Sequence, residues 1–125
     1  MQKPTSLPKI TGFEAIALEV GDFGRSVQFY ADVLRLEVEV LAPGHFAQVT
    51  GMSLYLLATG KKPVSKGFHI ELMVDDVEAW YTYLVERGIT PLSEPKDMPW
   101  GSRNFSLRDP DGHEIELSGA GRAAA

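Results

Sequence analysis

The chain has 125 residues, of which 44% are hydrophobic and 23% charged, an ordinary composition for one compact globular unit. Its formal net charge is −5 and no basic cluster is visible, so nucleic acid is not an expected partner. Cysteine is absent, which excludes disulfides, thiolate metal sites and a cysteine nucleophile. No apolar run could span a bilayer, and the first nine residues lack a signal-peptide core. We therefore expect a cytoplasmic protein that has no membrane partner.

The first half of the chain predicts one helix and four strands. Residues 13–20 predict a strand, in which Ile16, Leu18 and Val20 share one face and Ala15, Ala17 and Glu19 share the other. Asp22 can cap a helix over residues 24–34, where apolar residues recur at helical spacing. Short strands separated by glycine-containing turns are then expected over residues 36–41, 46–49 and 52–58. The glycine- and lysine-rich segment 59–67 is interpreted as a linker.

After the linker the same order of elements begins again. Residues 69–74 predict a strand, Asp76 a second cap, and residues 77–87 a helix that Gly88 ends. Further strands are expected over residues 89–92, 103–107 and 114–117. The last of these follows the turn Asp109-Pro110-Asp111-Gly112, where proline and glycine suit the backbone angles of a tight turn.

The two halves are an internal repeat. A shift of 54 residues places Ile16 on Ile70 and Asp22 on Asp76, and a shift of 61 places Leu54 on Ile115. Roughly 50 residues cannot close a core alone, so the two modules should pack together. We predict one α+β domain over residues 1–125, made of module 10–60 and module 66–119, with flexible tails at 1–9 and 120–125.

These features resemble the vicinal oxygen chelate superfamily, which includes glyoxalase I, extradiol dioxygenases, fosfomycin-resistance enzymes and bleomycin-binding proteins. The resemblance rests on the paired modules, the segment Asp22-Phe23-Gly24-Arg25-Ser26-Val27-Gln28-Phe29-Tyr30 and the Asp109-Pro110-Asp111-Gly112 turn. It extends over about residues 12–118. It implies two tandem βαβββ modules whose mixed sheets curve into a cup. It also implies a homodimer, in which the second subunit often completes the cup.

In metal-binding members of that superfamily, ligands lie on the first and last strand of each module. The matching positions here are Ala15, Tyr55, His69 and Glu116. Only His69 and Glu116 carry a good donor, so the resemblance makes these two the candidate metal ligands and catalytic residues. Two protein ligands seldom hold a catalytic divalent ion firmly. We therefore expect any zinc, nickel, manganese or iron to bind weakly, and a metal-free His69–Glu116 pair is the favoured alternative.

Six further residues are candidates for contact with a ligand, and two of them have an equally simple structural explanation. Trp100 could stack a flat ligand at the rim of the cup or anchor its loop in the core. Arg103 could hold a ligand anion, although pairing with a nearby carboxylate is the commoner arrangement. The full set is Phe46, Tyr55, Glu71, Met73, Trp100 and Arg103.

Two classes of function remain open. The first is a small-molecule-binding protein, similar to bleomycin-resistance proteins, that sequesters an aromatic or cationic ligand in an acidic cup. The second is a metal-dependent enzyme, either a lyase or isomerase similar to glyoxalase or a ring-cleaving dioxygenase. In it, a divalent ion would polarise vicinal oxygens and Glu116 would move a proton. A metal-free acid–base pair of His69 and Glu116 is a third reading. The missing donors at Ala15 and Tyr55 favour the binding protein.

Overall fold

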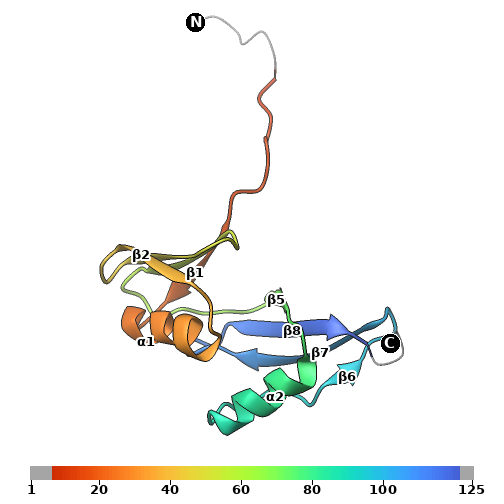
Figure 1. Ribbon diagram of the computed structural model, residues 1–125. Helices are drawn as coiled ribbons and strands as arrows, with labels where there is room; N and C mark the ends of the chain where they lie inside the picture. The colour runs from red at the N-terminus through yellow and green to blue at the C-terminus, as the bar shows by residue number, and fades with distance from the viewer. Residues whose placement is uncertain (1–6, 122–125) are drawn as a thin grey trace, which may run out of the picture.

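The computed structural model describes residues 7–121, and two modules of similar build make up the fold (Figure 1). The first contains β1 (Ile16–Val20), α1 (Phe23–Gln28), the π-helix η1 (Phe29–Val33), β2 (Val38–Ala42), β3 (Phe46–Val49) and β4 (Leu54–Ala58). The second contains β5 (His69–Met73), α2 (Val77–Glu86), β6 (Lys96–Asp97), β7 (Ser102–Arg108) and β8 (Glu114–Ala120). The tails expected at 1–9 and 120–125 fall mostly outside the described residues, but Ala120 still belongs to β8.

Each module forms one four-stranded mixed sheet. The strand orders are β1-β4-β3-β2 and β5-β8-β7-β6. In each sheet the first and last strands of the module are parallel neighbours, and the other neighbours are antiparallel. The α+β fold of two βαβββ modules is therefore confirmed.

The strand registers match the repeat residue by residue. In the first sheet Ile16 lies opposite Leu54, and in the second Ile70 lies opposite Ile115. The shifts of 54 and 61 residues found in the sequence convert the first pair into the second. Side chains at equivalent positions therefore lie on equivalent faces of the two sheets.

Both predicted helix caps are present. The Asp22 carboxylate accepts a hydrogen bond from the Arg25 backbone N–H at 3.0 Å, and Asp76 accepts one from Ala79 at 3.0 Å. Each carboxylate satisfies a backbone donor that the first turn of a helix leaves unpaired.

The first helix is not the single α-helix expected over residues 24–34. From Phe29 onwards the chain adopts a π-helix, in which the Leu34 N–H donates to the Phe29 carbonyl at 3.0 Å. A stripe of apolar residues does not distinguish this wider bonding pattern from α-helical bonding. Phe29 and Tyr30 are both buried in the wider turn.

The prediction of a strand over residues 89–92 is also wrong. On the side away from β8, β7 pairs instead with the two-residue strand Lys96–Asp97. Proline has no N–H to donate to a ladder, and Pro91 and Pro95 flank the stretch between the two positions. Within residues 89–92 only Leu92 bonds to β7, donating its N–H to Ser106 at 2.8 Å.

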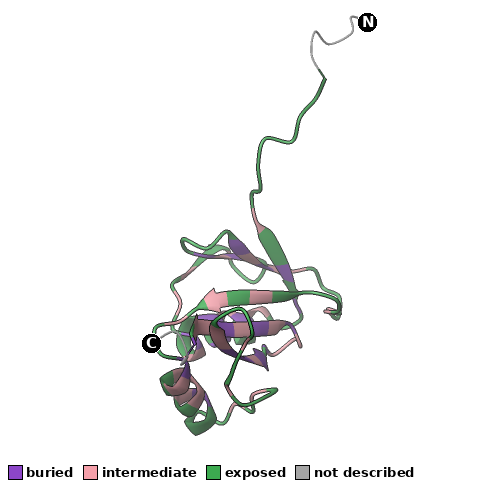
Figure 2. Ribbon diagram, turned by 90° about the vertical axis from the view of Figure 1, so that its right-hand side faces the viewer, coloured by how far each residue is buried: buried purple, intermediate pink, exposed green. Residues whose placement is uncertain are grey.

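One continuous buried cluster joins the two modules and leaves the other face of each sheet open. Helix α1 packs against β4, and α2 packs against β7 and β8. On the open face of the second sheet Met73 is 95% exposed. Figure 2 shows the buried residues gathered in the body of the molecule, whereas residues 7–14 project from it and are exposed. The main buried members are Leu18, Val20, Tyr30, Leu56, Leu84, Phe105, Leu107, Ile115 and Leu117.

The turn before β8 binds the second module to the first. The Tyr30 hydroxyl donates to the buried Asp109 carboxylate at 2.7 Å. The Asp111 carboxylate accepts from the Ser26 hydroxyl and from the Gly21 N–H, both at 3.0 Å. Burial first, and then the nearby Asp109 carboxylate, raises the pKa of Tyr30, so its hydroxyl remains a proton donor.

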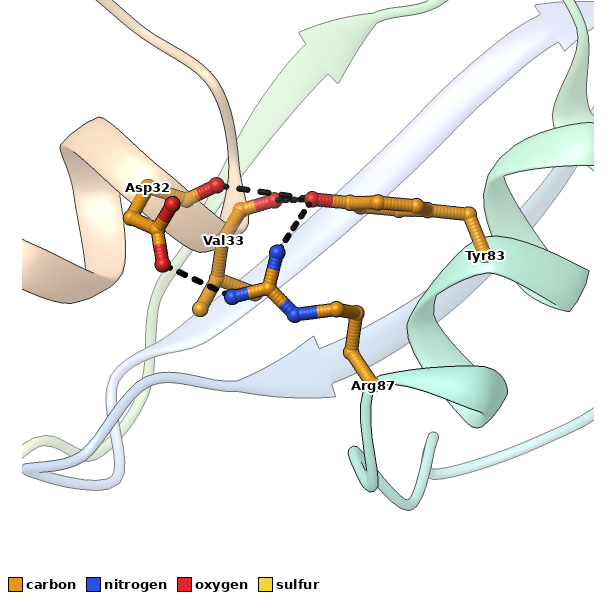
Figure 3. Close-up of polar contacts among 4 residues, drawn as sticks. All are labelled: Asp32, Val33, Tyr83 and Arg87. Carbon is orange, nitrogen blue, oxygen red and sulfur yellow. Dashed lines mark hydrogen bonds and ion pairs between the residues drawn. The ribbon is translucent and has the colours of Figure 1, made fainter.

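A second inter-module contact lies where η1 meets the end of α2 (Figure 3). The Tyr83 hydroxyl donates to the Val33 carbonyl at 2.9 Å. The Arg87 guanidinium pairs with the Asp32 carboxylate at 2.7 Å. The two modules are therefore joined by a buried contact at the turn before β8 and by a more exposed one between their helices.

Candidate functional site

The open face of the second sheet brings together His69, Glu71 and Glu116. One nitrogen of the imidazole and one oxygen of each carboxylate lie within 4.8 Å of one another. The His69 Nε2 and Glu71 Oε2 atoms are 3.7 Å apart. Three potential ligand atoms this close together could share a single cation.

The register of β5 and β8 explains the cluster. His69 and Glu71 are two residues apart on one strand, so their side chains point to the same face. Glu71 lies directly opposite Glu116, whereas the residue opposite His69 is Glu114. The sequence indicated only that His69 and Glu116 lie on neighbouring strands. The structure adds that Glu71, two residues from His69, is the direct partner of Glu116.

The surroundings of Glu116 disfavour the ionised form of its carboxyl group. Partial burial is the main cause that raises its pKa to about 6, and a hydrogen bond to Glu71 and the charge of Glu71 act in the same direction. His69 opposes this shift. The Glu71 and Glu116 carboxylates are close enough to share a proton, and a bound cation would remove the repulsion between them.

The chemistry of the three side chains fits a divalent metal ion. One imidazole nitrogen and two carboxylate oxygens meet the usual requirement for three protein ligands at a catalytic ion. The side chains of His69 and Glu71 are 42% and 64% exposed, so a small molecule could reach the ion from solvent. The sequence interpretation placed Glu71 among the ligand-contacting residues and did not count it as a metal donor. Its spacing of two residues from His69 was the signal available.

The positions of the first sheet that match the cluster carry no carboxylate or imidazole. Ala15 lies just before β1, and Ala17 lies opposite Tyr55. The Tyr55 ring stacks on Phe46, with the ring centroids 4.9 Å apart and the planes at 21°. This face can offer a flat wall to a ligand, and Phe46 and Tyr55 remain candidates for that role.

Arg103 lies on the opposite side of the second sheet from the cluster. It shares a face with the buried residues Phe105 and Leu107, and its guanidinium pairs with Glu78 of α2 and with Asp97. The structure therefore has the carboxylate pairing that the sequence analysis gave as the commoner arrangement.

Trp100 and Met73 are both open to solvent. Trp100 is 75% exposed and so does not anchor its loop in the core. Met73 shares the face of Glu71 on β5, next to a crevice of about 290 Å³. Phe13, Met52 and Leu54 of the first module line the other side of this crevice. An apolar group of a ligand would fit beside the Glu71 carboxylate.

A second cluster, formed by Asp109, Asp111 and His113, has a structural role. The Asp109 carboxylate already accepts two backbone N–H groups, from Asp111 and His113 at 2.9 Å each, besides the Tyr30 hydroxyl. His113 Nε2 lies 2.7 Å from the Glu19 carbonyl of β1, while its Nδ1 is buried without a partner among the described residues. These bonds fix the turn before β8 against the first module.

Comparison with known proteins agrees with this architecture. The model of the glyoxalase/bleomycin resistance protein/dioxygenase superfamily matches residues 12–117. The chain belongs to this superfamily. The resemblance to vicinal oxygen chelate proteins noted in the sequence is thereby confirmed.

Similar proteins within the superfamily include named enzymes. The chain is 29% identical to metallothiol transferase FosB of Staphylococcus epidermidis, with 87% of this chain and 82% of that protein covered. It is 28% identical to a probable lactoylglutathione lyase of Synechocystis, with 80% and 88% covered. A solved structure of a superfamily member from Sphaerobacter thermophilus shares 27% identity and a TM-score of 0.67, covering 88% of this chain and 98% of that one.

Within residues 7–121, no helix is both long enough and apolar enough to cross a membrane.

Proposed function

We propose that this protein is a divalent-metal-dependent enzyme that acts on a small molecule with neighbouring oxygen atoms. The observation that carries the proposal is the set of three ligand atoms within 4.8 Å on the open face of the second sheet. The sequence analysis favoured a metal-free binding protein because it counted two donors. Glu71 is a third potential donor, and it supports the metal-dependent enzyme, which was the other class of function left open by the sequence.

Each residue of the site has a distinct task in this proposal. A bound divalent ion supplies Lewis acidity toward the oxygen atoms of the substrate. His69 and Glu116 hold that ion, as the resemblance to metal-binding relatives implies. Glu71, Glu114 and Glu116 share this face, so a carboxylate that does not hold the ion can accept a proton from the substrate. The crevice beside Glu71 and Met73 would receive an apolar part of the substrate.

A metal-free binding protein is the second candidate, and a specific observation favours it. The stacked rings of Phe46 and Tyr55 offer a flat surface, and the Glu71 and Glu116 carboxylates offer negative charge. An aromatic cation would use both features. Trp100, which is exposed, remains a further candidate for stacking on a ligand.

We further propose a homodimer, at work in the cytoplasm, whose second subunit covers the open face. β1 and β5 are edge strands of their sheets, and unpaired strand edges are usually covered in stable proteins. Phe13 and Met73 near these edges are 76% and 95% exposed. Light scattering should give twice the monomer mass of 13.7 kDa at micromolar concentration. A single-chain mass would mean that the site stays as open as it is in one chain.

Metal analysis distinguishes the two candidate functions. We expect protein purified without chelators, and then supplied with manganese, iron, nickel or zinc, to bind about one ion per chain. His69→Ala should abolish this binding. Assays of thiol transfer and of lactoylglutathione cleavage, the reactions for which two relatives are named, should then require the ion. A protein that binds an aromatic cation but takes up no divalent ion would be the metal-free alternative.

A further inference from the structure

We infer that Glu71 is the third metal ligand and replaces the donor missing from the first module, so that one module holds the ion alone. This inference rests on the proposed function, because it concerns the same ion. Glu71 would complete the ligand set, and the second module alone would be needed to hold the ion. The resemblance supplied only His69 and Glu116.

The position of Glu71 supports this role. Glu71 lies opposite Glu116 on the neighbouring strand and two residues from His69 on its own strand. Its Oε2 atom is 3.7 Å from His69 Nε2, and its carboxylate belongs to the cluster within 4.8 Å. Glu71 is therefore the member of the set that contacts both of the others along and across the sheet.

The first module cannot supply the missing donor from its equivalent positions. The residues that correspond to His69, Glu71 and Glu116 are Ala15, Ala17 and Tyr55. The two alanines carry no donor, and the Tyr55 ring stacks on Phe46. The three positions of the first module that match the ligand positions of the second therefore offer the ion no good donor.

A ligand set of two carboxylates and one imidazole has a chemical consequence. Carboxylate oxygens suit manganese and other hard divalent ions, whereas imidazole favours nickel and zinc. Exchange of Glu71 for histidine should therefore raise nickel and zinc affinity relative to manganese affinity. The same exchange at Glu114 should not, because Glu114 shares the face but lies outside the cluster.

The test uses manganese and the full chain. Free manganese is measured by its electron paramagnetic resonance signal as the ion is added to the parent, Glu71→Gln and Glu114→Gln proteins. Glu71→Gln should weaken binding at least about tenfold, because the loss of a residue that only supports a ligand already costs a metal site about that much. Glu114→Gln is the matched control, because it removes the same charge from the same face. Its manganese affinity should stay within about threefold of the parent's, because Glu114 lies outside the cluster and salt screens its charge. Circular dichroism and thermal unfolding confirm that each variant is folded.

Each outcome decides the matter. If Glu71→Gln binds as the parent does while His69→Ala and Glu116→Gln do not, the inference is wrong and the proposed metal site stands. If both glutamine variants weaken binding equally, Glu71 acts only through its charge and the inference is wrong. If the parent takes up no manganese, nickel or zinc, the inference and the proposed function both fail. A rise in the nickel-to-manganese affinity ratio of Glu71→His, absent from Glu114→His, would confirm direct ligation.

Discussion

Glu71 and Glu116 lie directly opposite each other on β5 and β8, where Ala17 and Tyr55 lie opposite each other on β1 and β4. The two modules share a backbone register but differ in the charge of this pair of residues. Like charges directly opposite each other destabilise a sheet. A pair of this kind without a cation therefore costs folding free energy, and such local conflicts occur mainly at functional sites.

The first prediction concerns the pH dependence of stability without a divalent ion. The pKa of Glu116 in the folded protein is about 6, above its ordinary value of 4.5, so the folded state binds the proton more tightly than the unfolded state. The stabilising contribution of this group is therefore complete below pH 4.5 and is lost as the pH rises through about 6. Solvent screening keeps the effect near 1 kcal/mol or below.

Urea unfolding of the parent and of Glu116→Gln in the presence of a chelator checks this prediction. The parent should lose stability relative to the variant between pH 4.5 and pH 7, because the glutamine has no proton to lose. Adding manganese should reverse the order, since only the parent keeps a complete ligand set. Stability curves of the two proteins that run parallel over this range would contradict the expected sign.

The second prediction concerns the buried bond between Tyr30 and Asp109. Tyr30→Phe removes the donor at 2.7 Å and leaves a buried carboxylate oxygen without that partner. Loss of a buried hydrogen bond to a charged group costs about 1–3 kcal/mol. Thermal or urea unfolding should show a loss of this size. Tyr81→Phe is the control, because no hydrogen bond of the Tyr81 hydroxyl occurs within residues 7–121.

The third prediction concerns the pair of Arg87 and Asp32 (Figure 3). The two side chains are 38% and 58% exposed, so water and salt screen the attraction between them and keep it weak. Arg87→Met should change the unfolding midpoint much less than Tyr30→Phe does, and the small effect should vanish at high salt. A loss as large as that of Tyr30→Phe would mean that the helix contact joins the modules as strongly as the turn before β8 does.

The sequence predicted those parts of the fold that depend on local patterns. Asp22 and Asp76 lie directly before their helices, and the alternation of Ile70 and Leu72 with polar residues marks one buried face of β5. β3 has the predicted bounds, residues 46–49. The repeat could be found because equivalent residues keep a constant offset along the chain.

The remainder depends on contacts between distant segments. The sequence places His69 and Glu71 on one face of a strand, but the offset between β5 and β8 decides which residue lies opposite Glu116. The offset follows from hydrogen bonds between the strands, and residue types alone do not indicate it. The same holds for the pairing of Lys96–Asp97 with β7, since a two-residue strand leaves no recognisable pattern.

The last prediction transfers the site to the first module. By the repeat, Ala15, Ala17 and Tyr55 correspond to His69, Glu71 and Glu116. The triple variant Ala15→His, Ala17→Glu, Tyr55→Glu gives the first sheet the same three donors in the same register, a set suited to a divalent ion. Calorimetric titration with zinc should then show two ions per chain, where the parent binds one.

A His69→Ala change in the background of the triple variant decides how the donors are grouped. If each module holds its own ion, this protein should still bind one zinc at the first sheet. If donors of both modules instead surround a single point, the triple variant should bind one ion more tightly than the parent. In that case His69→Ala should remove most of the gain. Tyr55→Glu alone is the control, because it removes the stacking on Phe46 without completing either ligand set. A folded triple variant that binds no more zinc than the parent would show that the two open faces, despite their common register, are not equivalent.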